Sequence, residues 1–291
     1  MSEAQSIQWF PGHMARTKRQ IEKYLGQVDA IAEIVDARIP VSSRNPDLAR
    51  ITRNKPRVIL LNKSDMADAA ATKAWVAKVR TQNQLAIAVD CKTGRGLQQF
   101  QPAVKEVLAE KIAAWQRKGM VGHTIRVMVA GIPNVGKSSL INKLSHGSRA
   151  AVEDRPGVTR SNQWFPIGQG FDLLDTPGVL WPKFDDPVVG EHLAFTGAVK
   201  DEVLDTEQLA GRLLELLAAT YRQPLCARYK LQPQELEGME GWQILERIGR
   251  KRGMLVSGGG IDTARASVMV LDEFRAGKIG RITLEWPEKT P

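Results

Sequence analysis

The sequence predicts an α/β domain built on a mostly parallel sheet, followed by a small, mainly α-helical domain. Two observations indicate this division. Short apolar runs rich in β-branched residues first alternate with longer amphipathic segments, and after a proline-rich stretch the apolar residues recur only at intervals of three and four. A chain of 291 residues with 43% hydrophobic content has enough apolar material for two packed cores. We therefore expect domains at residues 1–184 and 185–291.

The first element expected is a basic amphipathic helix that begins at Met14. Apolar side chains there recur at helical spacing, while most Arg and Lys side chains fall elsewhere on the helical wheel. Strands and helices then alternate, which indicates parallel strands covered on both faces. The expected strands are Ala30–Val35, Val58–Leu61, Leu85–Val89 and Thr124–Ala130, and the expected helices are Ala69–Gln82, Gly96–Gln116 and one that begins at Lys137.

The first domain is expected to end in a hairpin and a linker. Segments Asn162–Ile167 and Phe171–Leu174 can pair as an antiparallel edge of the sheet. The stretch WPKFDDPVVG, Trp181–Gly190, is rich in proline and poor in periodicity, so it predicts the linker. Beyond it we expect helices at Glu207–Thr220, Gly241–Lys251 and Ile261–Ala276, and a short strand at Arg281–Trp286.

The charge of the chain favours a polyanionic partner. Its formal net charge is +9 and its pI is near 9.6, and clustered Lys and Arg gain free energy by releasing counterions from nucleic acid. Basic residues are densest at Arg16–Lys23 and at Arg247–Arg252. For either run, a solvated helix face is the alternative interpretation.

Cysteine usage and hydropathy indicate a cytoplasmic protein. The two cysteines, Cys91 and Cys226, lie far apart without CxxC or metal-ligand spacing, which fits a reducing compartment. No apolar leader opens the chain, and nowhere do eighteen apolar residues follow one another. We expect no membrane insertion and a monomeric protein.

The stretch GIPNVGKSS, Gly131–Ser139, matches the pattern GxxxxGK[ST] between an apolar strand and a helix, the context that makes this pattern specific. In such a loop, backbone N–H groups and the helix N-terminus wrap phosphates. Lys137 is expected to reach the β- and γ-phosphates, and the Ser138 hydroxyl is expected to ligate Mg²⁺. The alternative is a glycine-rich turn that only begins a helix.

The stretch FDLLDTPG, Phe171–Gly178, supplies the expected second half of a magnesium site. Asp175 ends an apolar strand, where a carboxylate would touch Mg²⁺ or its waters. Gly178 can offer its N–H to a γ-phosphate and leaves the following loop free to swing. Thr159, in RPGVTR, is the candidate for a mobile hydroxyl that closes on Mg²⁺ when a triphosphate binds. A loop threonine without that role is the alternative.

Two loops that precede the phosphate loop have the character of a guanine site. In NKSD, Asn62–Asp65, the Asp65 carboxylate can accept hydrogen bonds from N1–H and N2–H₂ of guanine, which adenine does not offer. Asn62 can tie the base pocket to the phosphate loop, and the Lys63 stem can lie along the purine. In DCKTGRG, Asp90–Gly96, a backbone N–H near Cys91 is expected to meet guanine O6.

The order of these motifs predicts a circularly permuted P-loop GTPase domain. In the usual order the phosphate loop precedes the base-reading loops, and here it follows them. The change costs little, because termini of compact domains often lie close together and a packed sheet does not record where the chain was opened. Gly178 then leads within a few residues into the C-terminal helices. A γ-phosphate that orders the switch loops is therefore expected to reposition the appended domain.

Seven motifs spread over most of the chain together carry a family resemblance: WFPGHM (Trp9–Met14), VDARIP (Val35–Pro40), NKSD, GIPNVGKSS, PGVT, DTPG and GGGIDTARA (Gly258–Ala266). This set resembles the circularly permuted GTPases of the YlqF type, the ribosome biogenesis GTPase A family. The resemblance implies an assembly factor that binds the immature large (50S) ribosomal subunit in its GTP state, hydrolyses GTP there and leaves. It also implies that the C-terminal helices contact ribosomal RNA, a role that we give to Arg247, Arg250, Lys251 and Arg252.

The group that activates water is not evident from the motifs. Ras-like enzymes orient the attacking water with a Gln just after DxxG, but Val179 and Leu180 follow here. The resemblance implies two substitutes, a potassium ion held near Asn134 and His13 of PGHM swinging toward the γ-phosphate. A neutral imidazole is capable of orienting or deprotonating water near pH 7. The alternative for His13 is to fix the N-terminal segment or to contact RNA phosphate.

The leading hypothesis is therefore a GTPase that uses GTP with Mg²⁺ and K⁺ and is stimulated by ribosomal particles containing rRNA and ribosomal proteins. A GTP-gated RNA-binding module with incidental hydrolysis is one alternative, and a GTPase of transfer RNA modification is another. The expected catalytic residues are His13 and Lys137, and the Mg²⁺ ligands are Ser138, Thr159 and Asp175. The expected nucleotide-binding residues are Asn62, Lys63, Asp65, Cys91, Lys92, Asn134, Val135, Gly136, Lys137, Ser138, Ser139 and Gly178.

Overall fold

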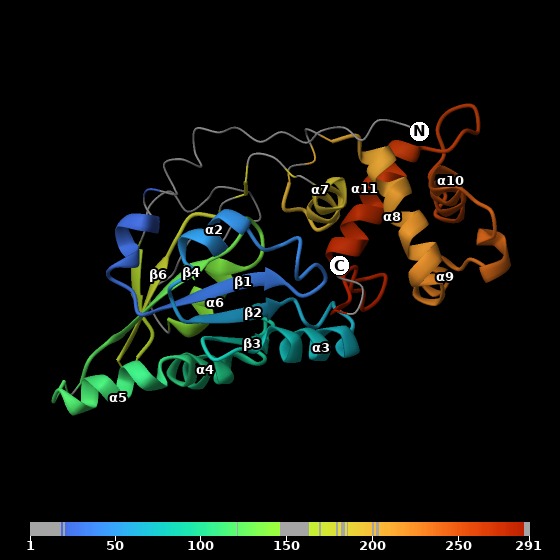
Figure 1. Cartoon of the computed structure of the whole chain (residues 1–291). Coiled ribbons are helices and arrows are strands. Elements are labelled where there is room, and N and C mark those ends of the chain that lie inside the picture. The colour runs from blue at the N-terminus through green and yellow to red at the C-terminus, as the bar shows by residue number, and fades with distance from the viewer. Residues whose placement is uncertain are drawn as a thin grey trace. The chain divides into compact units, whose positions relative to one another are not determined.

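The structure is a computed structural model, and its chain divides into two compact units. The first unit comprises Met1–Asp186 and Thr283–Pro291, and the second comprises Pro187–Ile282. We call them the sheet unit and the helical unit (Figure 1). The structure describes Arg19 and residues 21–120, 122–145, 163–168, 170–178, 180–181, 184, 186–199, 201 and 204–287.

The sheet unit contains a six-stranded sheet in the order β3-β2-β1-β4-β6-β5. Five strands run parallel, and β5 pairs antiparallel with β6 at the edge, so the predicted parallel sheet with an edge hairpin is confirmed. The strands are β1 (Ala30–Asp36), β2 (Arg57–Asn62), β3 (Gln84–Ala88), β4 (Ile125–Ala130), β5 (Gln163–Pro166) and β6 (Phe171–Asp175).

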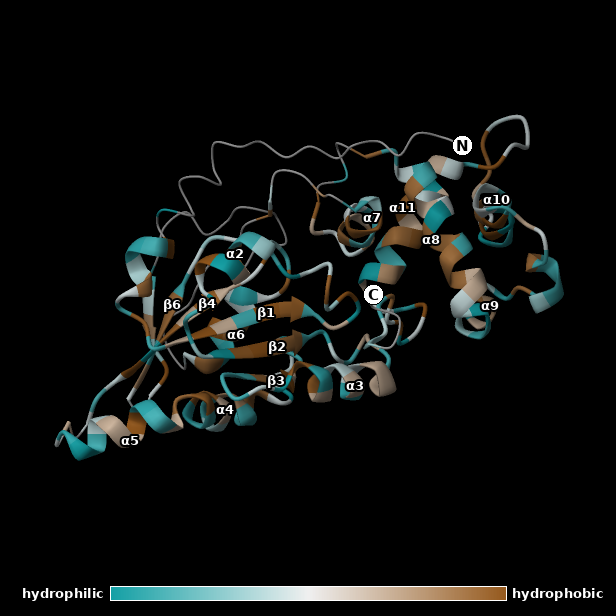
Figure 2. Ribbon diagram, in the orientation of Figure 1, coloured by the Kyte–Doolittle hydropathy of each residue, from teal (hydrophilic) through white to brown (hydrophobic). Residues whose placement is uncertain are grey.

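Burial explains why the central strands read as nearly continuous apolar runs. Every residue of β1 and of β2 is buried, as expected for parallel strands covered on both faces. Figure 2 shows these strands in the colour of hydrophobic residues. On one face, Trp75 of α3 (Ala69–Val79) packs against Ile59 and Leu61 of β2. Alternation along a strand turns residues such as Val58 and Leu60, also buried, to the opposite face.

The strand order fixes where loops converge. From β1 the chain moves to β2 and β3 on one side, and it later returns to place β4 on the other side of β1. This reversal between β1 and β4 is a topological switch point, and ligands of open α/β sheets bind outside the carboxyl ends of strands at such a point. The segments that follow β1, β2, β3, β4 and β6 all leave this edge, which we call the carboxyl edge.

The helices of the sheet unit differ from the prediction in two main respects. Helix α2 (Pro46–Ile51) was not predicted, although Asn45 caps it by accepting bonds from Asp47 N (2.9 Å) and Leu48 N (3.3 Å). The single helix expected at Gly96–Gln116 is wrong in its extent. It is a 3₁₀ turn followed by α4 (Phe100–Val107) and α5 (Ala109–Arg117), with the break at Leu108. The break follows burial, because α4 buries apolar side chains and α5 buries none. The helix expected from Lys137 is α6 (Lys137–Leu144), and the basic helix is described only at Arg19 and 21–25.

The helical unit consists of helices, as predicted, and its core is apolar. Leu213, Leu217 and Ile248 are fully buried. Two helices approach closely at glycines, since a Cβ on Gly241 would lie 2.1 Å from the Gly211 carbonyl oxygen. None of the described helices is long and apolar enough to cross a membrane. The helices are α7 (Pro187–Phe195), α8 (Thr206–Thr220), α9 (Arg222–Tyr229), α10 (Gly241–Lys251) and α11 (Thr263–Arg275), with a 3₁₀ turn at Pro233–Leu236.

Helix α7 corrects the linker prediction, because it begins at Pro187 inside the stretch Trp181–Gly190. Proline suits the first turn of a helix, where its missing N–H is not needed. The strand expected at Arg281–Trp286 is also wrong, since no ladder forms there. Instead, Leu284 N donates to Arg38 O (2.8 Å). The other contacts that hold this segment involve side chains.

Those contacts return the end of the chain to the sheet unit. The Glu285 carboxylate accepts from the backbone N–H of Val41 (2.5 Å) and of Ser42 (3.1 Å). Its carbonyl oxygen accepts from Trp75 Nε1 (2.7 Å), and Lys78 Nζ donates to Pro287 O (2.6 Å). The helical unit is therefore an insertion between two segments of the sheet unit.

Candidate nucleotide-binding site

The phosphate loop joins β4 to α6 at the carboxyl edge, and Gly136 allows its close packing. Gly136 has φ +103, and a Cβ there would lie 2.3 Å from Asn62 Nδ2. Only glycine leaves room for the Asn62 amide to donate to Val135 O at 2.6 Å. Ser138 and Ser139 follow in the first turn of α6, whose leading N–H groups have no partner within the helix. This is the geometry of an anion site at a helix N-terminus.

Lys137 lies folded into the loop that it begins. The residue is 7% exposed, and its Nζ donates to Ile132 O (2.7 Å) and Gly131 O (3.1 Å). Burial lowers the pKa of Lys137 from 10.5 to about 8, although the Asp175 carboxylate acts to raise it. A buried ammonium with only carbonyl partners is costly. Phosphate oxygens would add acceptors and negative charge beyond that of Asp175.

Gly178 of the DTPG turn lies against the same loop. A Cβ at this position would lie 2.7 Å from Lys137 Nζ and 3.0 Å from Pro133 N, so a side chain would displace one of them. Asp175 ends β6 and is 2% exposed, and Thr176 Oγ1 donates to Val129 O (2.7 Å). The structure thus brings Gly178, Asp175 and Lys137 together.

Asn62 joins the base-reading loops to the phosphate loop. Besides donating to Val135 O, it accepts from the Cys91 N–H through Oδ1 (2.8 Å). The side chain is 4% exposed, so both bonds are sheltered from water. The three loops predicted to surround one nucleotide therefore meet at a single amide.

Asp65 carries an unmet hydrogen-bonding requirement. Its Oδ1 atom is buried and has no hydrogen-bond partner among the residues that the structure describes. A buried carboxylate oxygen without a donor costs free energy, so a ligand that brings N–H groups is favoured there. Guanine presents two such donors, N1–H and N2–H₂, on one edge. The placement fits the role predicted for Asp65.

The loop DCKTGRG is ordered by its own first residue. The Asp90 carboxylate accepts from Lys92 N (2.9 Å) and from Thr93 Oγ1 (2.5 Å). Burial, and secondarily the Asp90 charge, raise the pKa of the Cys91 thiol to about 12, so it stays protonated and is not a nucleophile. Because Cys91 N–H donates to Asn62, a bond from this loop to guanine O6 stays a prediction.

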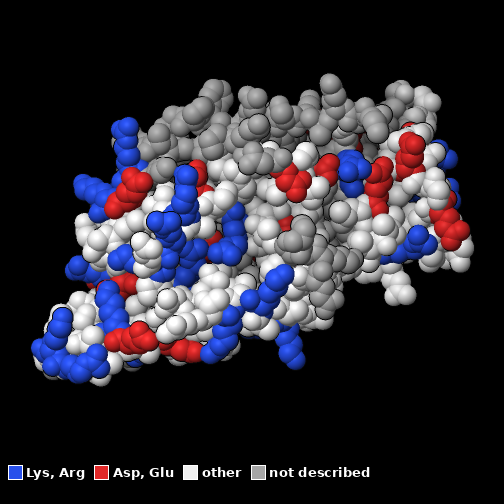
Figure 3. Space-filling model, in the orientation of Figure 1, with Lys and Arg blue, Asp and Glu red and all other residues white. Residues whose placement is uncertain are grey.

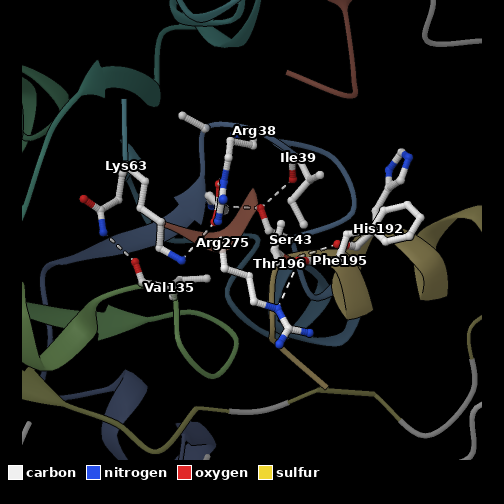
Figure 4. A network of polar contacts seen from close by, with 12 residues as sticks. Arg38, Ile39, Ser43, Lys63, Val135, His192, Phe195, Thr196 and Arg275 are labelled. Carbon is white, nitrogen blue, oxygen red and sulfur yellow. Dashed lines mark hydrogen bonds and ion pairs between the residues drawn. The ribbon is translucent and has the colours of Figure 1, made fainter. Parts of the chain in front are cut away.

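Sequence reasoning missed Asp36, which holds Lys63, and Arg38, which is bound to the same carboxylate. Asp36, 2% exposed, accepts from Arg38 Nε (2.9 Å) and Nη2 (2.8 Å), and Lys63 Nζ lies 3.1 Å from its Oδ2. Figure 4 shows the Arg38 and Lys63 side chains converging on one point. Burial acts to raise the pKa of Asp36, but the charges of Arg38 and Lys63 hold it well below its usual range. Ser43 Oγ accepts from the Asp36 N–H (3.0 Å) and fixes the backbone there.

Both residues belong to the motif VDARIP, whose spacing alone indicates no chemistry. Lys63 adopts φ +59, a strained value for a residue with a side chain. Asn134 of the phosphate loop likewise has φ +60. Strained positions gather at functional sites when their surroundings hold them in place. The Asp36 carboxylate supplies that restraint for Lys63.

A magnesium ion bound with a nucleotide takes most of its ligands from phosphates and water, so it needs few protein ligands. Asp175 at the end of β6 and Ser138 at the start of α6 offer one carboxylate and one hydroxyl at the carboxyl edge. Among the described residues, no three His, Cys, Asp or Glu side chains gather to hold a metal. The residues fit an ion that arrives with phosphate. His13 and Thr159 lie outside the described residues, and the roles predicted for them stay predictions.

The predicted RNA-contacting residues lie at the end of α10 and just beyond it. Arg250 and Lys251 are exposed, whereas Arg247 pairs with Glu235, and Arg252 lies over Tyr229 at 5.5 Å and 3.6 Å from Glu273. The helical unit as a whole contains thirteen Lys and Arg and thirteen Asp and Glu residues. Its formal charge is zero. The remaining chain holds 28 basic and 19 acidic residues, so the whole excess of +9 belongs to the sheet unit.

The fold and the site define a P-loop GTPase whose base-reading loops precede its phosphate loop. A family model described as 50S ribosome-binding GTPase matches residues 126–235. The ribosome biogenesis GTPase A of Bacillus cereus is 44% identical over 285 residues, which span 97% of this chain and 95% of that protein. The chain belongs to the ribosome biogenesis GTPase A family.

More distant relatives and solved structures agree. The ribosome biogenesis GTPase A of Thermotoga maritima is 32% identical, with 97% of this chain and 95% of that protein covered. A GNP-bound YlqF structure from T. maritima is 29% identical with a TM-score of 0.66, covering 94% of this chain and 100% of that chain. The predicted family, its α/β fold followed by helices, and a GTPase function in ribosome biogenesis are confirmed.

Proposed function

We propose that this GTPase binds the precursor of the large ribosomal subunit in its GTP state, hydrolyses GTP there and is released. The nucleotide is held within residues 1–184, and the RNA contacts of the appended part lie within residues 185–291. The protein acts as a monomer in the cytoplasm. The family model supports the choice of the large subunit, because it is described as 50S ribosome-binding.

The observation that carries the nucleotide assignment is the buried Oδ1 of Asp65. It lacks a hydrogen-bond donor among the described residues, while Asn62 three positions earlier is bonded to the phosphate loop. A guanine base would bond Asp65 and let the attached phosphates reach Lys137, Ser138, Ser139 and the Gly178 N–H. Lys63, Lys92, Asn134, Val135 and Gly136 complete the proposed nucleotide contacts, together with Cys91.

The proposed chemistry uses two cations. Mg²⁺ would be held by Ser138, Asp175 and Thr159, and it would supply charge stabilisation for the transferring phosphoryl group. We place K⁺ near Asn134, whose backbone already has the left-handed conformation. His13 is the proposed residue that orients the attacking water. Leu180, which follows the DTPG turn, is 2% exposed and apolar, so it cannot take that role.

Hydrolysis assays test this proposal directly. GTP turnover should be slow for the isolated protein, faster with purified large-subunit precursors, and faster in potassium than in sodium at equal ionic strength. Mature small subunits serve as the control particle. Equal rates in all conditions would contradict both the ribosomal and the potassium parts, while hydrolysis of ATP at the rate of GTP would contradict the assignment of Asp65.

A GTP-gated RNA-binding module with incidental hydrolysis is the second candidate, favoured by the apolar Leu180 next to the switch turn. The two functions differ in what a hydrolysis-deficient variant does. A His13→Ala protein that binds GTP but does not hydrolyse it should accumulate on precursor particles if release needs hydrolysis. Normal maturation with that variant would favour the binding module.

A further inference from the structure

The amino edge of the sheet, opposite the nucleotide loops, carries a group of cations that the GTPase chemistry does not use. Asp29, directly before β1, is at its centre. Its carboxylate accepts from Lys111 Nζ (2.6 Å) and from Arg126 N (2.9 Å), and His123 Nε2 lies 3.7 Å away. Lys55 donates to Val28 O (2.7 Å) in the same place.

Positive charge exceeds negative charge at this edge. The pKa of Lys55 is lowered by burial and by repulsion from Lys111, and Asp29 only partly offsets this. Helix α5 adds Arg117 at its end, Lys118 follows it, and both are exposed. The nearby carboxylates Glu106 and Glu110 are turned to Arg80 (2.6 Å) and Gln82 (3.2 Å). Asp172 of β6, which is half-buried, is a further acidic residue here and pairs in register with Arg126 of β4.

Two tryptophan rings lie beside these cations. Lys111 Nζ lies 5.1 Å from the ring centre of Trp115, and the Arg126 guanidinium lies 5.4 Å from that of Trp164. The Trp164 side chain is 36% exposed, on the edge strand β5. Cations beside one exposed and one partly buried ring suit a sugar-phosphate backbone with accessible bases. Figure 3 shows Lys and Arg side chains gathered over the end of α5.

We propose that this amino-edge surface, defined by Lys55, Lys111, Arg117, Lys118, His123 and Arg126 with Trp115 and Trp164, binds the backbone of ribosomal RNA. The inference rests on the proposed function, because it assigns a second RNA contact of the same protein. The distribution of charge agrees with it, since the excess of +9 lies in the sheet unit and the helical unit is neutral. An acidic protein partner is the alternative, and the measurements described below separate it from RNA.

The surface is remote from the nucleotide, so its contribution is separable from catalysis. Parallel strands of about six residues place the two edges of the sheet roughly 20 Å apart. Salt would screen any direct effect of these charges on the phosphates over that distance. Substitutions at the amino edge should therefore leave intrinsic GTP hydrolysis unchanged.

The test compares two triple variants on two helices. The amino-edge variant is Lys111→Gln, Arg117→Gln and Lys118→Gln on α5 and its end. The control variant is Lys73→Gln, Lys78→Gln and Arg80→Gln on α3 and its end. The variants are matched, because each removes three exposed cations, one ion pair and one Lys from above a tryptophan ring (Lys111 at 5.1 Å, Lys78 at 5.3 Å).

Affinity for protein-free large-subunit rRNA and for purified large subunits is measured over a range of salt. We expect the amino-edge variant to bind at least about tenfold more weakly near 0.1 M salt, with a log–log salt slope smaller by about two. The control variant should stay within about twofold of the parent protein. Equal losses in both variants, or an unchanged salt slope, would overturn the inference.

Two further outcomes are decisive. A loss on subunits but not on free rRNA would indicate an acidic protein contact instead and overturn the proposal. If the parent protein hydrolyses GTP but binds neither rRNA nor subunits, the proposed ribosomal function fails, and the amino-edge contact fails with it. Normal hydrolysis by both variants shows in each case that they are folded.

Discussion

The sheet unit buries charged side chains, whereas the described part of the helical unit is built almost entirely from apolar packing. Burying a charge costs several kcal/mol unless it is paired, and even a paired one rarely improves stability over apolar residues. The sheet unit accepts this cost partly at the carboxyl edge, where the nucleotide is expected, and partly at Asp29, Glu33 and Arg57, which lie away from that edge. Charged residues of the sheet unit that are at most 8% exposed are Asp29, Glu33, Asp36, Arg38, Arg57, Asp90, Lys137 and Asp175, against Glu273 in the helical unit.

The two units also use glycine for different ends. Gly136 and Gly178 keep space open for side chains of the nucleotide loops, so their absent Cβ atoms serve binding. The absent Cβ atoms of Gly211 and Gly241 let two helices approach closely, so these glycines serve packing. The comparison teaches that stability and function are carried by separate parts of this chain. Substitutions in each unit test that separation.

The largest effect on activity is expected for Lys137→Met. Losing a cation aimed at the transferring phosphate should lower GTP hydrolysis by about 10³-fold or more. Without nucleotide the variant should be more stable near pH 7, by up to about 3 kcal/mol, because burial lowers the pKa of Lys137 to about 8.

The pH dependence of this stability difference is a second test of the buried Lys137. Between about pH 8 and 10.5 the unfolded chain binds a proton at Lys137 that the folded protein does not, so stability of the parent protein should rise with pH there. The gain of Lys137→Met should therefore shrink over that window, as measured by urea unfolding. Lys143→Met, exposed on the same helix, is the control. A destabilised Lys137→Met protein would contradict the idea that this site is held at a cost in stability.

Glycine substitutions should separate the two units. Gly136→Ala forces a Cβ to 2.3 Å from Asn62 Nδ2 at φ +103, and we expect GTP affinity to fall by about 10²-fold or more with the helical unit unaffected. Gly241→Ala forces a Cβ to 2.1 Å from Gly211 O, and we expect the helical unit to lose about 3 kcal/mol while GTP affinity holds. Calorimetric binding and hydrogen exchange resolved by unit measure both.

Gly26→Ala is the matched control, since nothing lies within 4 Å of its added Cβ. It should change neither quantity appreciably. Loss of GTP affinity in Gly241→Ala, or protection lost in the helical unit of Gly136→Ala, would show that the two units are coupled in stability.

Asp65→Asn tests the guanine assignment. The amide cannot accept two bonds from guanine as a carboxylate does, so GTP affinity should fall by about 10²- to 10³-fold, the worth of two charge-assisted bonds. Xanthosine triphosphate should bind the variant better than the parent, because its C2 carbonyl accepts from the new amide. Asp68→Asn, a cap of α3 three residues later, is the control and should leave nucleotide binding unchanged. Unaltered GTP affinity in Asp65→Asn would sink the assignment.

Much of this site could be predicted from local sequence, and the part that could not depends on pairing across strands. Gly131–Ser139 and Asn62–Asp65 each carry their geometry in adjacent residues, such as Gly136 at the position that needs positive φ. The contact of Asp36 with Lys63 arises because β1 and β2 pair in a register that sets Asp36 beside Asn62. No spacing along the chain reveals that register.

Charge shows the same limit. The run Arg247–Arg252 looked like a basic surface in sequence, but Glu235 and Glu273 come from other segments to face Arg247 and Arg252. Helices α2 and α7 were missed because each is short and begins with proline, which looks like a turn in sequence. Folding decides which charges cancel, and composition alone does not.

Asp36→Asn tests the restraint on Lys63. Removing the carboxylate from the buried Arg38 should cost about 3 kcal/mol of unfolding free energy at pH 7. The KM for GTP should rise about tenfold with kcat little changed, because Lys63 loses its position but touches no reacting atom. Lys63→Met should reproduce the KM effect with less destabilisation, since Asp36 keeps Arg38. A fall in kcat without a change in KM would contradict a positioning role.

Stability at acid pH tests the same residue, Asp36. Arg38 and Lys63 hold the pKa of Asp36 below its unfolded value of 3.8, so its stabilising contribution is present above that pH and is lost as pH falls further. The difference in stability between Asp36→Asn and the parent protein should therefore shrink below about pH 4. Urea unfolding at pH 7, 4 and 3 measures this, and a constant difference would contradict it.

The smallest effect is expected in the helical unit, for Arg250→Gln with Lys251→Gln. Both side chains are exposed at the end of α10, so they can contact phosphate, but the unit around them is neutral and adds little long-range attraction. Affinity for large-subunit rRNA should fall only severalfold, and the salt slope by between one and two. Arg222→Gln with Lys230→Gln, exposed on α9 and its end, is the control.

The comparison with the amino-edge variant then decides where the RNA affinity originates. If the sheet unit supplies most of the electrostatic attraction, its triple variant should lose more affinity per cation removed than the α10 pair. If the α10 pair loses as much or more per cation, the neutral unit holds the principal RNA contact in spite of its balanced charge. Net charge of a unit would then be a poor guide, and local geometry at Arg250 and Lys251 would have to explain the binding.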